Sequence, residues 1–105
     1  MVTESPFYGQ NPVAYGPVVG TSSAQVIGFN AQRKKIYFQN PNATAIIAVC
    51  CSIDNNGAAL AAVVNGRGSW TILPRSDLVL DYRPVSAFNA ISDTPGAGLT
   101  ILESV

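Results

Sequence analysis

Few side chains in this sequence could move a proton or hold a metal ion. The chain has no histidine and only six carboxylates, and histidine is the side chain whose ordinary pKa lies closest to neutral pH. Its aspartates lack the spacing of a calcium-binding loop, and its two cysteines do not form a Cys-x-x-Cys pair. We therefore predict a protein that is not an enzyme and that uses no cofactor and no metal ion. The aspartates are Asp54, Asp77, Asp81 and Asp93.

One segment resembles a catalytic loop. Asp93-Thr94-Pro95-Gly96-Ala97 is similar to the Asp-Thr-Gly-Ala loop of the retroviral-type aspartic proteases, but Pro95 interrupts the motif at the glycine. Proline removes a backbone donor and fixes φ where that loop needs the freedom of glycine. Such a loop would not place two carboxylates side by side, so we interpret the segment as a plain turn.

The two cysteines, Cys50 and Cys51, are adjacent in a strand-like apolar run. Alternation along a strand sends one side chain inward and the next outward, and a disulfide between neighbours would be strained. We therefore predict two free thiols.

Trp70 and the cluster Arg33-Lys34-Lys35 each have two interpretations. In an alternating strand of a small β-domain, tryptophan is more often a core residue than an exposed platform for a sugar or a base, so we predict a core position for Trp70.

The basic cluster Arg33-Lys34-Lys35 is predicted to be a solvated strand entry. The alternative is a salt bridge to an acidic patch on a partner. Because the net charge is zero, no global field favours direct binding to nucleic acid.

The composition indicates that part of the surface is covered by a partner. Charged residues make up 11% of the chain and hydrophobic residues 48%, whereas globular domains have roughly 25% charged residues. So little charge protects a monomer poorly from association. No apolar run approaches the roughly 20 residues of a membrane span, and the start lacks the layout of a secretory signal. We therefore expect no membrane partner and synthesis in the cytoplasm.

Residues 1–20 differ in composition from the rest. Three prolines, including Pro17, are interleaved with three glycines, a density that disfavours helices and central strands. Phe7, Tyr8 and Tyr15 are unusual for a disordered linker, which is normally poor in aromatic residues. We predict that residues 1–20 form an extended arm in which Phe7, Tyr8, Tyr15 and Pro17 contact a partner. The alternative is a frayed terminal tail.

Residues 21–105 read as one all-β domain. Short segments with alternating or continuous apolar residues are separated by Asn, Gly, Pro and Asp turns, a pattern typical of an antiparallel β-sandwich. About eight such strands can close as a jelly roll or pack as a Greek-key sandwich. The predicted strands are 24–29, 35–39, 45–53, 58–64, 69–73, 77–82, 86–91 and 99–102.

Four segments of this domain together resemble parts of small virion proteins of tailed bacteriophages. They are the basic strand Arg33–Asn40 ending in Gln-Asn, the turn Asn42–Thr44, and the closing segments Ala87–Ser92 and Gly98–Glu103. The resemblance implies a β-sandwich of the jelly-roll type that sits on the capsid exterior as a cement or decoration protein. It implies the major capsid protein and a second copy of the chain as partners, with a homodimer favoured over a homotrimer. No catalytic residue is carried over by these motifs.

Two other functions stay open on the sequence. A head or tail spike or fibre protein that binds a host glycan would account for Trp70 and the tyrosines. A head–tail connector or completion subunit would be present in few copies per virion, whereas a decoration protein would be present in hundreds.

Overall fold

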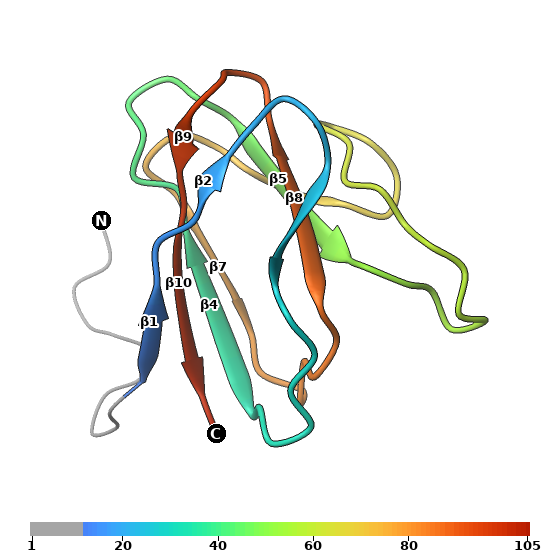
Figure 1. Cartoon of the computed structure of the whole chain (residues 1–105). Coiled ribbons are helices and arrows are strands. Elements are labelled where there is room, and N and C mark those ends of the chain that lie inside the picture. The colour runs from blue at the N-terminus through green and yellow to red at the C-terminus, as the bar shows by residue number, and fades with distance from the viewer. Residues whose placement is uncertain (1–11) are drawn as a thin grey trace.

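The computed structural model describes residues 12–105, and every regular element in that range is a β-strand (Figure 1). The prediction of an all-β domain is confirmed. The strands are β1 (Val13–Tyr15), β2 (Val18–Val19), β3 (Ala24–Ile27), β4 (Lys35–Gln39), β5 (Ile47–Cys51), β6 (Trp70–Ile72), β7 (Asp77–Leu80), β8 (Phe88–Ser92), β9 (Ala97–Gly98) and β10 (Thr100–Ser104).

The strands form an antiparallel β-sandwich. One sheet has the order β1-β10-β4-β7 and the other β3-β8-β5-β6, while β2 and β9 form a two-stranded ladder (Figure 1). All of the paired strands run antiparallel. Strands β7 and β6 lie at the edges of their sheets and follow each other in the chain through the short turn at residues 73–76.

The core lies between the two sheets, and its residues follow the period of two expected for strands. Ile36 and Phe38 on β4 are fully buried, as are Ile47 and Val49 on β5. The ring of Phe38 meets the ring of Phe88 on β8 edge to face, with centroids 5.3 Å apart. This contact joins the two sheets near the centre of the domain.

Strand β5 is buried on both faces, as its continuous apolar run predicts. Its outer face is covered by the connection to β6. Ala62 of that connection is 2% exposed, and its backbone N–H donates to Ser23 Oγ (2.9 Å). The side chain of Asn89, on β8 beside Cys50, donates to the carbonyl of Leu60 (2.8 Å). The connection therefore acts as a third, irregular layer over this sheet.

The prediction of a strand at 58–64 is wrong. The only ladder contact of this segment among the described residues is an isolated bridge between Ile53 and Ala59. Later in the segment, the backbone N–H of Val63 donates to the side chain of Ser69, which directly precedes β6 (Val63 N to Ser69 Oγ, 3.1 Å). The segment has the apolar composition of a strand because it covers a sheet face, but the backbone N–H groups of Ala62 and Val63 donate to side chains and not to a neighbouring strand.

The described part of the predicted arm, residues 12–20, is hydrogen-bonded into the sandwich. Strand β1 pairs with β10, and β2 pairs with β9. Val19 is 2% exposed and belongs to the core, whereas Val18 beside it is 73% exposed. The composition break near Gly20 therefore does not mark the start of the folded domain. Residues 1–11 lie outside the described range.

Two smaller predictions are confirmed. Both cysteines are free; Cys50 is buried, which raises the pKa of its thiol, and Cys51 is half-buried. The segment at Asp93 forms a turn between β8 and β9, in which the Asp93 carboxylate accepts a hydrogen bond from the backbone of Ile46 (2.9 Å). Within residues 12–105, no helix is long and apolar enough to cross a membrane.

Asn40 joins three parts of the fold from a fully buried position. Its amide nitrogen donates to the carbonyls of Ala45 (2.8 Å) and Ile72 (2.9 Å), so it links the β4–β5 turn to β6. Its oxygen accepts hydrogen bonds from the backbone and side chain of Asn42, which in turn donates to the carbonyl of Gly98 (2.8 Å). The Asn-Pro-Asn turn is thus a structural element of the core.

Replacing Asn40 with alanine should lower the free energy of unfolding by about 2–4 kcal/mol, because two buried carbonyls lose their donor. Urea unfolding followed by circular dichroism measures this loss. Asn55→Ala, in the exposed turn after β5, is the matched control and should change stability by no more than about 0.5 kcal/mol. Equal losses in the two variants would contradict the role assigned to Asn40.

Candidate functional site

A pocket of about 470 Å³ opens between the edge strands β6 and β7. The segment 81–86, which follows β7, forms the rest of its wall. The inner part of the pocket is lined by Phe88, which is fully buried, and by the half-buried Cys51 and Leu80. Its volume lies within the range of roughly 300–1,000 Å³ that is usual for small-ligand sites.

Trp70 lies at this pocket and not in the core, so the prediction of a core position is wrong. Its register places it opposite Val49 on the inner side of β6, but its side chain is 40% exposed. The reason is that β6 is an edge strand, and beyond it the two sheets leave the pocket open. The indole therefore lines a solvent-accessible wall.

The rim of the pocket combines an aromatic ring with two opposite charges. Tyr82 is 97% exposed and is flanked by the exposed Asp81 and Arg83. Within residues 12–105, none of these three side chains has a hydrogen bond or ion pair to another side chain or to the backbone. Their polar atoms are thus available to an incoming molecule.

The backbone of the pocket wall is strained at Arg83. This residue has φ of 53°, in the left-handed region that non-glycine residues rarely adopt, and it precedes Pro84. The backbone N–H of Val85 donates to the Arg83 carbonyl (2.8 Å), which closes a tight turn. Such a conformation costs on the order of 1–3 kcal/mol and persists only when the surrounding structure holds it.

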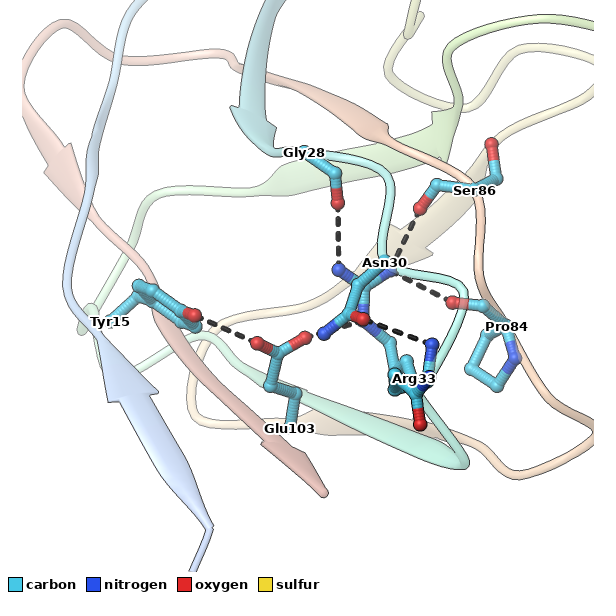
Figure 2. A network of polar contacts seen from close by, with 8 residues as sticks. Tyr15, Gly28, Asn30, Arg33, Pro84, Ser86 and Glu103 are labelled. Carbon is cyan, nitrogen blue, oxygen red and sulfur yellow. Dashed lines mark hydrogen bonds and ion pairs between the residues drawn. The ribbon is translucent and has the colours of Figure 1, made fainter. Parts of the chain in front are cut away.

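Arg33 supplies that support from behind the wall (Figure 2). Its Nη1 donates to the carbonyls of Pro84 and Ser86, each at 2.8 Å, and its Nη2 donates to the carbonyl of Gly28 at 2.7 Å. Its Nε forms an ion pair of 2.6 Å with Glu103 Oε2. The side chain is fully buried, so the prediction that the basic cluster is solvated is wrong for Arg33.

Glu103 joins this network to the N-terminal strand. Its Oε1 accepts a hydrogen bond of 2.7 Å from the hydroxyl of Tyr15, on β1 (Figure 2). Desolvation raises the pKa of Glu103, but the hydrogen bonds from Arg33 and Tyr15 stabilise the carboxylate and bring the pKa below its ordinary 4.5. The hydrogen bond to Glu103 raises the pKa of the Tyr15 hydroxyl, and desolvation raises it further.

The four residues predicted to contact a partner are not brought together in the described range. Tyr15 is engaged within the chain, and the carbonyl of Pro17 accepts a hydrogen bond from Leu99 (3.0 Å). Tyr15 also lines a second hollow, of about 360 Å³, at the opposite edge of the sandwich beside Phe29. Phe7 and Tyr8 lie outside the described residues.

The pocket and the ion pair were both missed from the sequence, although one signal for the ion pair was present. In the last strand, Ile101 and Glu103 are two residues apart, which places a carboxylate on the face that carries the core. A carboxylate at such a position requires a buried partner. No sequence pattern indicated that the partner is Arg33.

No protein family, curated protein or solved structure matches this chain. The candidate site therefore rests on the geometry described above.

Replacing Glu103 with glutamine should lower the free energy of unfolding by about 3–5 kcal/mol, because the buried guanidinium of Arg33 loses its counter-charge. Chemical denaturation at neutral pH measures the loss. Lys34→Gln, an exposed neighbour of Arg33, is the control and should stay within about 0.5 kcal/mol of the wild type. A Glu103→Gln variant as stable as the control would show that the pair is not required.

Acid should destabilise the protein through the same carboxylate. Because the pKa of Glu103 is lower in the folded state, its contribution to stability is fully present above its ordinary value of 4.5 and is lost as the pH falls through the folded-state pKa. Unfolding free energies measured from about pH 7 down to about pH 3 should therefore fall more steeply for the wild type than for Glu103→Gln. Parallel curves for the two proteins would contradict this assignment.

Proposed function

We propose that the protein is a structural virion protein that attaches to the outer surface of a phage capsid as a decoration or cement protein. The observation that carries the proposal is apolar surface on a domain with few charges. Val18, Phe29 and Leu73 are 73%, 69% and 55% exposed, and they lie on different parts of the sandwich. A domain with so few charges is poorly protected from association, which supports the proposal that part of this surface is covered in an assembly.

The strand order supports the same class of protein. Eight strands, four in each sheet, have the orders β1-β10-β4-β7 and β3-β8-β5-β6. Apart from β5 and β6, which pair in one sheet, successive strands of these two sheets alternate between them, and the first and last strands are neighbours. We assign this arrangement to the jelly-roll type, which keeps unpaired strand edges short.

Stabilisation of the shell would follow from binding linkage. A subunit that binds the assembled, expanded shell and not its precursors favours the assembled state by mass action. The proposed partners are the major capsid protein and a second copy of this chain. In this proposal Phe7 and Tyr8 contact the neighbouring subunit.

A capsid-binding experiment tests this proposal. Purified protein is mixed with expanded shells that lack it, the shells are sedimented, and bound copies are counted. We expect saturation at hundreds of copies per shell and greater resistance of the shell to heat. Deletion of residues 2–11 keeps β1 and should abolish attachment while leaving the thermal unfolding of the free protein unchanged.

Other outcomes would identify a different function. A dozen or fewer copies per virion would indicate a connector or completion subunit. Attachment by the truncated protein would contradict the role of Phe7 and Tyr8. Absence of capsid binding would overturn the proposal and favour a head or tail spike or fibre protein that binds a host glycan, for which the exposure of Trp70 is the supporting observation.

A further inference from the structure

We propose that the pocket between β6 and β7 binds a neutral N-acetylated sugar. The inference does not depend on capsid attachment, because it concerns the isolated domain. It rests on the aromatic surfaces, the apolar inner wall and the paired charges of this pocket, each of which selects a different part of such a ligand.

The aromatic side chains suit the ring of a sugar. Trp70 on one wall and Tyr82 at the rim each present an apolar ring with a polar N–H or O–H at its edge. A pyranose has the same character, with C–H groups on its face and hydroxyls around it. Side chains that are apolar on the face and polar at the edge bind such ligands at a water-exposed site.

The inner wall selects an apolar substituent. Phe88 is fully buried, and Leu80 and Cys51 are half-buried beside it. A sugar with hydroxyls alone would leave its polar groups without partners against this wall. The methyl group of an acetamido substituent fits it, and burial of one methyl is worth roughly fourfold in affinity.

The charges at the rim select a neutral ligand. Asp81 and Arg83 carry opposite charges on either side of Tyr82, so the rim has no net field for a phosphate or a nucleic acid. The carboxylate accepts hydrogen bonds from hydroxyl or amide donors, and the guanidinium donates to hydroxyl or carbonyl oxygens. An N-acetylated sugar offers both donors and acceptors.

The pocket wall is also held in place before a ligand arrives. Arg33 binds the carbonyls of Pro84 and Ser86 from the protein interior, and the backbone of Asn30 donates to the carbonyl of Val85 (2.9 Å). A wall fixed in this way loses little conformational entropy on binding. Arg33 is therefore a positioning residue for the site.

Fluorescence titration tests the proposal directly, because Trp70 is the only tryptophan in the chain. The isolated protein is titrated with N-acetylglucosamine and N-acetylgalactosamine, and with glucose and galactose as matched controls without the acetamido group. We expect a saturable change in emission with at least one N-acetylated sugar, and affinity at least about fourfold weaker for its parent sugar. In parallel, the bound sugar should slow alkylation of Cys51, which lines the pocket.

Two variants separate the pocket from the rest of the surface. Tyr82→Ala should weaken binding about tenfold or more without unfolding the domain, because the side chain is almost entirely exposed. Phe29→Ala removes an exposed ring at the opposite edge of the sandwich and should bind as the wild type does. Circular dichroism confirms that both variants are folded.

The proposal is overturned if no N-acetylated sugar changes the emission of Trp70 at concentrations up to about 10 mM. It is also overturned if Tyr82→Ala and Phe29→Ala bind equally well. If an apolar aromatic peptide changes the emission while the sugars do not, the pocket receives a side chain of a protein partner instead. Capsid attachment is measured separately, so failure of either proposal leaves the other to its own result.

Discussion

The buried ion pair between Arg33 and Glu103 is the interaction on which most of this domain's arrangement depends. Removing two charges from water is costly, and the pair is tolerated because its remaining hydrogen-bonding groups are also satisfied. The guanidinium donates to carbonyls in the β3–β4 connection and in the β7–β8 connection. The carboxylate accepts a hydrogen bond from the hydroxyl of Tyr15. Three segments far apart in the chain therefore bind the same ion pair. Moving any of them would break a hydrogen bond to a buried charged group.

This arrangement explains why the sandwich is closed at one place and open at another. At its centre, Phe38 and Phe88 bring the two sheets into contact. At the β6–β7 edge, the segment 81–86 is held from the interior by Arg33, so it cannot collapse onto Trp70 and fill the space between the sheets. The left-handed backbone of Arg83 is kept in place by the same bonds. The pocket is thus a consequence of how the buried charge is satisfied.

Two features of the described surface underlie the two proposals. Exposed apolar side chains are spread over the sandwich, and the paired charges at the pocket rim leave it neutral. The proposed attachment and the proposed ligand binding are compatible, because the exposed Val18, Phe29 and Leu73 are not among the residues that line the pocket. The Tyr15 hollow and the Trp70 pocket lie at opposite edges of the sandwich, beside β1 and beside β7.

The sequence by itself determined the local features of this protein. Alternation fixed which residues of 35–39 face the core, the apolar run around Ile47–Cys51 predicted a strand covered on both sides, and Asn40 marked the turn between them.

Tertiary structure decided the other features, because they depend on which segments become neighbours. Residues 58–64 resemble a strand in composition but lie over a sheet face, where their ladder pairing within the described part of the chain is limited to the isolated bridge between Ile53 and Ala59. Trp70 faces inward as its alternation predicts, yet the edge position of β6 leaves it exposed. Arg33 is buried only because folding brings Glu103, which is distant in sequence, within hydrogen-bonding distance.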